Sequence, residues 1–278
     1  MPSLGAEEHF ADALARPQSQ RQTRLRIADY ARQLAGTGIF VVGSALAGPA
    51  FWLLRRLPGR WVSEEGGQLL LHHFFRAFLG ALRLLGCVHI DADGLGDLKN
   101  LRGTVVAANH PGLIDAFLLA SLLPRVACVM KADLLANPTL REGALLAGYV
   151  TNDSGPGMVR QGICRIRDGG NLLIFPEGTR TRSQAVNRFK SGFAVIAVTT
   201  GAPVQTLLIE THGRHLSKGT SLLAPAKLPL RFKIRLGGRF VPEKGESARD
   251  FAARLELWFR AQLVNTGDGI RAMNPPEN

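Results

Sequence analysis

A histidine and an aspartate lie five residues apart in AANHPGLIDAF, residues 107–117, between a short apolar run and a helix-like segment. Facing side chains on one continuous helix are three or four residues apart, so His110 should lie in the turn before the helix and Asp115 in its first turn. We expect Pro111 at or near the first helical position. A carboxylate bound to one imidazole nitrogen leaves the other nitrogen as a base. His110 and Asp115 are therefore candidates for a general-base pair.

A second polar cluster follows another apolar run, in the stretch LLIFPEGTRTRS at residues 172–183. Backbone N–H groups, a hydroxyl and a guanidinium at the end of a strand suit a phosphate or another oxyanion. Because α/β proteins bind ligands at the carboxyl end of the sheet, we expect the two clusters to lie at that end. The polar members of this second cluster are Glu177, Gly178, Thr179 and Arg180.

Short apolar runs alternate with helical stretches from about residue 101, which is typical of an α/β fold with a mixed sheet flanked by helices. An alternating segment at 228–240 should form a half-exposed edge strand, and residues 247–263 a last amphipathic helix before a polar tail. The pattern predicts buried strands at 104–108, 126–130, 171–175 and 203–209, and helices near 112–122, 139–147, 157–168 and 191–199.

The segment before this core is helical and apolar. Residues 33–54 carry no charge over about the length of one bilayer crossing, with arginines on both sides. A simple spanning helix usually has a one-sided charge bias, so the symmetry favours a re-entrant hairpin broken near Gly48-Pro49, or an interfacial helix pair. A buried helix pair in a soluble core is the alternative. Residues 68–86 read as an amphipathic helix that lies on lipid or on the core.

The chain of 278 residues is long enough for one large domain with an appendage. Acidic residues and the lack of an apolar run in the first thirty residues argue against a cleaved signal peptide. We divide the chain into a polar, basic N-terminal segment (1–32), a membrane-associating helical region (33–86), an α/β core (87–240) and a C-terminal helix with a polar tail (241–278).

The net charge of +12 suits nucleic acid, anionic lipid or phosphorylated substrates. Only 7% of the residues are aromatic and they form no repeated stacking pattern, which argues against nucleic acid. The three cysteines are scattered and the histidines do not cluster with other ligands, so we expect no metal or cofactor. The G-x-S-x-G pattern of many serine hydrolases is absent.

The two polar clusters resemble the first and third motifs of the glycerolipid acyltransferases, typified by 1-acylglycerol-3-phosphate acyltransferase. NHPGLID and FPEGTRT carry the resemblance, which extends over roughly residues 85–215. It implies an O-acyltransferase in which His110 deprotonates the acceptor hydroxyl and Asp115 orients the imidazole, so that the acceptor attacks an acyl thioester directly. The resemblance also implies acceptor binding by Glu177, Gly178, Thr179 and Arg180. We expect Glu177 to bind a hydroxyl or a basic side chain.

Several other positions bear on the substrates. The family's second motif commonly ends in an arginine, whereas GYVTND places Asn152 and Asp153 there, which weakens the case for a phosphate on the acceptor. Thr206 replaces the second proline of the fourth motif. Lys131 and Lys190 stand where the family tends to carry lysines, and can equally be solvated surface residues. Together with Asn152 and Asp153 they are possible donor or acceptor contacts.

The resemblance implies acyl-CoA or acyl carrier protein as donor and a lysolipid such as 1-acylglycerol-3-phosphate as acceptor. An acceptor without phosphate, with an amino-acid head or another hydroxylated lipid, is the alternative. The basic composition fits a surface of anionic lipid, and residues 33–86 should hold the enzyme at the cytoplasmic face of the inner membrane. A non-catalytic, basic membrane-binding protein would explain the charge as well, and it would function without His110.

Overall fold

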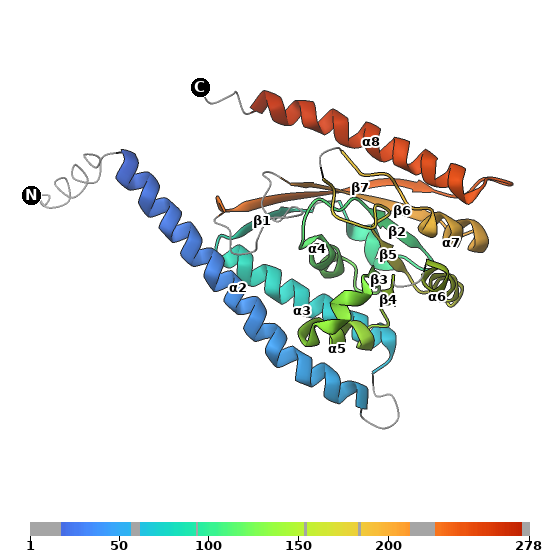
Figure 1. The fold of residues 1–278 in the computed structure, drawn as a ribbon, viewed down its shortest axis with the longest axis horizontal. Helices are drawn as coiled ribbons and strands as arrows, with labels where there is room; N and C mark the ends of the chain where they lie inside the picture. The colour runs from blue at the N-terminus through green and yellow to red at the C-terminus, as the bar shows by residue number, and fades with distance from the viewer. Residues whose placement is uncertain are drawn as a thin grey trace, which may run out of the picture.

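The computed structural model describes residues 18–56, 62–92, 94–152, 155–182, 185–211 and 226–273. Their strands form one seven-stranded sheet in the order β1-β7-β6-β2-β5-β3-β4 (Figure 1). All neighbouring strands are parallel except β6 and β7, so the sheet is mixed as predicted. The strands are β1 Val88–Asp91, β2 Val105–Ala108, β3 Ala127–Met130, β4 Val150–Thr151, β5 Leu172–Ile174, β6 Val204–Thr211 and β7 Leu230–Phe240.

Helices cover both faces of the sheet, because its central strands are apolar on both sides. In β2, Val106 and Ala108 face a core with α3 (Glu64–Leu84) and α4 (Asp115–Leu122). Val105 and Ala107 face the opposite core, which contains side chains of α6, α7 and α8. These helices are α6 Gly155–Arg167, α7 Gly192–Thr200 and α8 Ala248–Met273, and α5 spans Pro138–Leu146. Short 3-10 helices, η1 Gly96–Asn100 and η2 Ala132–Ala136, complete the connections.

The four buried strands and the helices between them confirm the predicted α/β core. Two predictions about its borders were wrong. The segment at 228–240 forms β7, but this strand lies between β1 and β6 instead of at an edge. Alternation correctly indicates one exposed face, yet it carries no information about the neighbours within the sheet. The C-terminal helix α8 also extends to Met273, into the segment expected to be a polar tail.

The N-terminal apolar segment is one continuous helix, α2, from Gln18 to Arg56, with Pro49 inside it. The re-entrant hairpin broken near Gly48-Pro49 was therefore a wrong prediction, and so was its alternative, a helix pair within this segment. A proline inside a helix costs about 3 kcal/mol because it removes one hydrogen bond and crowds the preceding turn. Packing of α2 against α5 and α3 stabilises the helix across this position.

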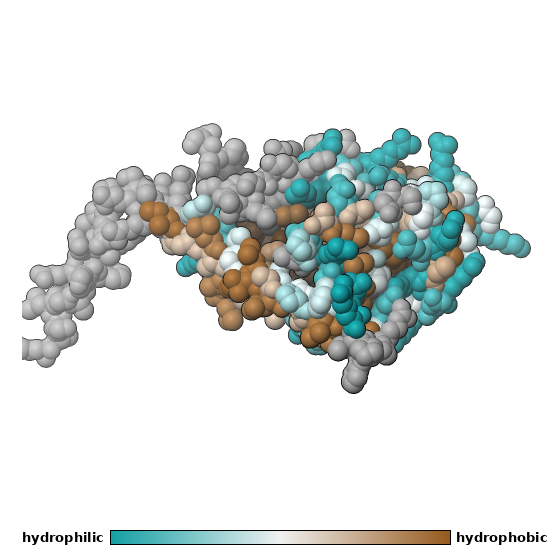
Figure 2. Space-filling view, turned by 60° about the horizontal axis from the view of Figure 1, so that its bottom comes forward, coloured by the Kyte–Doolittle hydropathy of each residue, from teal (hydrophilic) through white to brown (hydrophobic). Residues whose placement is uncertain are grey.

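Much of α2 is apolar and exposed. Within the described part of the chain, Ile27–Arg56 is the one helical segment long and apolar enough to cross a membrane. Only 17% of its most apolar 18-residue stretch is buried. On the face drawn in Figure 2, hydrophobic residues gather at the left and lower centre of the view, and hydrophilic residues are more frequent at the right. The exposed apolar side chains of α2 include Leu34, Val41, Val42, Leu46 and Leu53. This helix is a candidate membrane-associating region, as predicted.

Candidate active site

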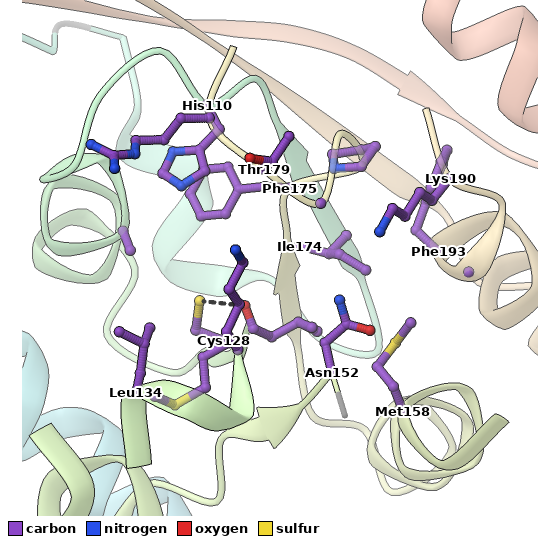
Figure 3. Close-up of a pocket in the computed structure, with 18 of the residues that line it drawn as sticks. His110, Cys128, Leu134, Asn152, Met158, Ile174, Phe175, Thr179, Lys190 and Phe193 are labelled. Carbon is purple, nitrogen blue, oxygen red and sulfur yellow. Dashed lines mark hydrogen bonds between the residues drawn. The ribbon is translucent and has the colours of Figure 1, made fainter. Parts of the chain in front are cut away.

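A cavity of about 380 Å³ lies where four neighbouring parallel strands end. His110 follows β2, Lys131 follows β3, Asn152 follows β4, and the segment from Phe175 to Arg180 follows β5. Figure 3 shows His110 and Thr179 at one end of this cavity, with Asn152 and Lys190 at its sides. The expectation that the two polar clusters meet at the carboxyl end of the sheet is confirmed.

His110 and Asp115 form the expected contact. Nδ1 of His110 lies 2.9 Å from Oδ2 of Asp115, and the same oxygen accepts a hydrogen bond from the N–H of Gly112 at 2.7 Å. Asp115 is fully buried, whereas 19% of the His110 side chain is exposed. Burial raises the pKa of Asp115, and the hydrogen bond with His110 opposes that shift. The pair thus leaves Nε2 as the ring nitrogen that a substrate in the cavity can meet.

The turn that carries His110 differs from the prediction in one respect. Helix α4 begins at Asp115, and Pro111 lies four residues before it instead of at the first helical position. Residues 111–114 form a turn that folds back, so Asp115 reaches His110 from the first residue of the helix. On its other side the His110 ring stacks on Phe175, with ring centroids 4.2 Å apart and an angle of 21° between the planes. Phe175 was not among the residues predicted for the site.

Glu177 is buried and does not line the cavity. Its Oε1 accepts a hydrogen bond from the N–H of His110 at 2.9 Å, and its Oε2 accepts one from the N–H of Asn187 at 2.8 Å. The hydroxyl of Thr181 lies 2.8 and 2.9 Å from the two oxygens. Of the two expectations for Glu177, a hydroxyl or a basic side chain as its partner, the structure shows a hydroxyl. This hydroxyl is that of Thr181, in the protein itself. In this structure Glu177 joins the third-motif loop to the His110 loop.

Asn109 holds the other side of the His110 loop. Its side-chain amide donates to the carbonyl of Ile209 at 2.8 Å, and its oxygen accepts from the N–H of Ile209 at 2.7 Å. These two bonds tie the His110 loop to β6 beyond the last paired residue of β2, Ala108. The N–H of Thr181 also donates to the carbonyl of His110 at 2.7 Å. The sequence offered one signal for Asn109, a polar residue directly after a buried strand.

Three cationic side chains line the cavity, from Lys131, Arg180 and Lys190. Gly178 has φ +64°, and a Cβ at this position would lie 2.9 Å from Cε of Lys190. The aliphatic part of Lys190 thus crosses the backbone of Gly178, which requires glycine both for its conformation and for the space. Lys131 and Lys190 are exposed, as surface lysines are, yet both also contribute to the cavity wall.

The residues at the second motif give the cavity an amide instead of a cation. Asn152 lines the cavity, and its backbone N–H donates a hydrogen bond to the carbonyl of Met130 at 2.8 Å. Asp153, the other predicted contact, lies outside the described residues. Arg165 supplies no replacement cation, because it pairs with Glu64 and binds the carbonyl of Gly148 in a different cavity. Thr206 is buried and donates to the carbonyl of Gly238 within the β6–β7 pair, away from the cavity.

Cys128 also lines the cavity and brings a thiol to it. Burial raises its pKa to about 12, so the thiol stays protonated at neutral pH and is a poor nucleophile. Within the described ranges, no group of three or more His, Cys, Asp or Glu side chains is placed to hold a metal ion. The arrangement around His110 thus supports general-base chemistry on a substrate that brings its own electrophile.

The region that holds this site is similar to known acyltransferases. Residues 89–210 match the Acyltransferase family. A 1-acyl-sn-glycerol-3-phosphate acyltransferase from Pseudomonas aeruginosa is 24% identical over 219 residues, which cover 76% of this chain and 82% of that protein. Over the region that holds the site, the chain is similar to glycerolipid acyltransferases. The 1-acyl-sn-glycerophosphate acyltransferase from Thermotoga maritima shares the fold, with a TM-score of 0.69 at 21% identity over 86% of this chain and 97% of that one.

Other lipid acyltransferases match over shorter regions. A 1-acyl-sn-glycerol-3-phosphate acyltransferase from Cocos nucifera is 28% identical over 145 residues, which are 49% of this chain and 46% of that protein. The chain therefore spans about half the length of the plant relatives that it matches. A lyso-ornithine lipid O-acyltransferase from Pseudomonas aeruginosa is 31% identical over 113 residues, covering 37% of this chain and 41% of that protein.

Proposed function

We propose that the protein is a glycerolipid acyltransferase that moves a fatty acyl group from an acyl thioester to the hydroxyl of a lysolipid, with His110 as the general base. The observation that carries the proposal is the 2.9 Å contact between Nδ1 of His110 and the buried Asp115, beside a cavity at the end of the sheet. The carboxylate fixes the tautomer of the ring and leaves Nε2 as the proton acceptor.

The reaction needs no covalent enzyme intermediate. Nε2 of His110 takes the proton of the acceptor hydroxyl while the oxygen attacks the thioester carbonyl carbon. The new C–O bond forms, the tetrahedral intermediate collapses, and the C–S bond breaks. The imidazolium then returns its proton to the leaving thiolate, which departs as the free thiol. Asp115 positions the ring throughout and stabilises its positive charge.

The charges around the cavity support an anionic donor. Lys131, Arg180 and Lys190 line it, and they suit the phosphates of coenzyme A or the phosphopantetheine of an acyl carrier protein. The exposed apolar face of α2 supports association with a membrane of anionic lipid, at its cytoplasmic face, where the acyl thioester is made available.

The same cations also suit the phosphate of 1-acylglycerol-3-phosphate, which is the acceptor named for the Pseudomonas and Cocos relatives. A second acceptor class is favoured by Asn152, which places an amide in the cavity where the family commonly has an arginine. An amide repels neither sign of charge and binds a zwitterionic or amino-acid head by hydrogen bonds. The lyso-ornithine lipid acyltransferase among the relatives uses an acceptor of that kind.

The test compares both acceptors with the same purified protein in detergent. We expect thioester consumption with lysophosphatidic acid and with lyso-ornithine lipid, with comparable kcat/KM for the two, and loss of both activities in His110→Ala. Asn152→Arg should shift the kcat/KM ratio toward lysophosphatidic acid. Transfer to neither acceptor would contradict the proposed function. A strong preference of the wild type for lysophosphatidic acid, unmoved by Asn152→Arg, would remove the second acceptor class.

A further inference from the structure

The C-terminal helix α8 lies on the side of the sheet opposite α2 (Figure 1). The side chains of Phe251, Leu255 and Phe259 hold it there, because they follow one another at a spacing of four residues and are fully buried. This helix lies beyond residues 89–210, the part of the chain that matches the Acyltransferase family. It therefore gives the site a support from outside the matched region.

Glu256 of α8 binds the backbone of segment 185–190, which follows the third motif and leads into α7. Its Oε2 accepts a hydrogen bond from the N–H of Phe189 at 2.8 Å, and its Oε1 accepts two from the guanidinium of Arg260, at 3.0 and 2.8 Å. The ring of Phe189 is buried, and its centroid lies 5.3 Å from that of Phe259. Helix α8 thus holds Phe189 by its backbone and by its side chain.

The next residue is Lys190, one of the three cations of the cavity. Its N–H donates to the carbonyl of Pro176 at 2.8 Å, so the backbone at 189 and 190 is fixed on one side by α8 and on the other by the third motif. The Lys190 side chain then passes over Gly178 to the cavity wall (Figure 3). Among the described residues, none forms a salt bridge with Lys190, so its backbone determines where the charge lies.

We propose that Glu256 is a positioning residue of the site, which acts through Phe189 and places the charge of Lys190 for an anionic substrate. This inference rests on the proposed function, in which Lys190 meets a phosphate of the donor or of the acceptor. Glu256 itself does not line the cavity. Without its carboxylate, the N–H of Phe189 loses its acceptor, and a buried donor without an acceptor is unfavourable. The backbone at 189 and 190 then moves, and the ammonium of Lys190 moves with it.

The test begins with Lys190→Ala and Glu256→Ala in the whole chain. We measure kcat/KM for palmitoyl-CoA and for lysophosphatidic acid in turn, and Lys190→Ala identifies the substrate whose phosphate the lysine meets. For that substrate, Glu256→Ala should lower kcat/KM about tenfold, the loss expected when one charge-assisted hydrogen bond is lost. Alanine preserves the helix, because it has the highest helix propensity.

Glu246→Ala is the matched control. Glu246 also accepts two hydrogen bonds from a guanidinium, that of Arg254, and one from a backbone N–H, that of Glu243. None of these three residues lines the cavity. We expect Glu246→Ala to lower the unfolding midpoint about as much as Glu256→Ala does, and to keep the wild-type kcat/KM for both substrates.

A double-mutant cycle shows whether Glu256 acts through Lys190. In protein that already lacks the lysine side chain, Glu256→Ala should lower kcat/KM by less than about twofold, because the effects of coupled residues do not add. Hydrogen exchange without substrate gives a readout that does not depend on activity. Glu256→Ala should speed the exchange of segment 185–190, whereas Glu246→Ala should leave it as in the wild type.

The outcomes separate this inference from the proposed function. Equal losses from Glu256→Ala with and without the Lys190 side chain would overturn the inference, and so would wild-type kinetics of Glu256→Ala or of Lys190→Ala. Unchanged exchange of segment 185–190 in Glu256→Ala would overturn it as well. Absence of transfer by the wild type to every lysolipid would instead refute the proposed function, and the exchange measurement would still test how Glu256 holds the segment.

Discussion

Oε1 of Glu177 accepts a hydrogen bond from the backbone N–H of His110 at 2.9 Å, although the two residues are 67 positions apart in the chain. The same carboxylate holds the Thr181 hydroxyl and the N–H of Asn187. The acidic residue of the third motif therefore positions the histidine of the first motif, and it does so from a buried place outside the cavity.

Glu177→Gln should lower both stability and turnover. An amide has one acceptor oxygen, so at least one of the backbone N–H groups of His110 and Asn187 would face an NH₂ group. A buried donor without its acceptor costs about 1–3 kcal/mol. We expect a lower unfolding midpoint in denaturant and a lower kcat, with a smaller change in the KM of the thioester. An unchanged kcat in a destabilised protein would show that the bond to His110 has no positioning role.

His110→Ala should lower kcat by about 10² to 10⁴-fold, the usual loss when a general base is removed. The fold should persist, because His110 is partly exposed and its loop is also held through Asn109. His89→Ala, at an exposed histidine of β1, is the matched control and should keep wild-type turnover. Steady-state kinetics and circular dichroism of the two variants provide the measurement. Comparable turnover in the two folded variants would contradict general-base catalysis by His110.

Asp115→Asn should change the dependence of stability on pH. Burial raises the pKa of Asp115 in the folded protein, so its contribution to stability is fully present below the unfolded pKa of about 3.9 and is lost as pH rises through the folded pKa. Asparagine does not ionise, so the stability of the variant does not decrease with pH for this reason. Its free energy of unfolding relative to the wild type should therefore improve between pH 4 and pH 7, as measured by urea denaturation. A difference that stays constant with pH would argue against a raised pKa.

Gly178→Ala should reduce activity by displacing Lys190. A Cβ at φ +64° is strained by about 1 kcal/mol, and it would also collide with the side chain of Lys190. Gly201→Ala is the matched control, since Gly201 has φ +68° and no neighbour within 4 Å of the added Cβ. We expect similar destabilisation of the two variants but a loss of kcat/KM in Gly178→Ala alone, close to that of Lys190→Ala. Equal activity of both glycine variants would remove Lys190 from the site.

Leu46→Glu should weaken membrane binding. Leu46 is 72% exposed in the apolar face of α2, where a charge opposes contact with the acyl region of a bilayer. Leu257→Glu places the same charge at a leucine of α8 that is 69% exposed, and it should bind vesicles as the wild type does. Co-sedimentation with vesicles containing anionic lipid measures the difference. Equal binding by both variants would show that α2 is not the membrane-facing surface.

The core and the contact between His110 and Asp115 could be predicted from local patterns in the sequence. The buried strands are short uninterrupted apolar runs, and His110 and Asp115 are close in the chain, so spacing alone limits their geometry. Strand β1 was not predicted, because its four residues, VHID, are too few to show a periodic pattern. Since β1 is the outer neighbour of β7, the inner position of β7 could not be predicted either. The continuity of α2 through Pro49 depends on packing against α5, which the local sequence does not show.

The sequence predicted that Glu177 belongs to the site, but it did not predict which groups Glu177 binds. Its place in the third motif pointed to the site, and the chemistry of a carboxylate excluded direct contact with a phosphate. Its partners could not be named, because the N–H of His110 comes from a loop that only the sheet brings near. Asn109 was missed for the same reason, since its partner Ile209 lies 100 residues away.

These distant partners also determine when the protein becomes able to work. His110 and Asp115 leave the ribosome almost together, but the residues that fix their loop arrive 67 and 100 positions after the loop itself. Contacts between distant parts of a chain form late, because loop closure costs entropy before the contact is made. A nascent chain therefore displays the apolar helix α2 long before the loop that carries His110 is ordered.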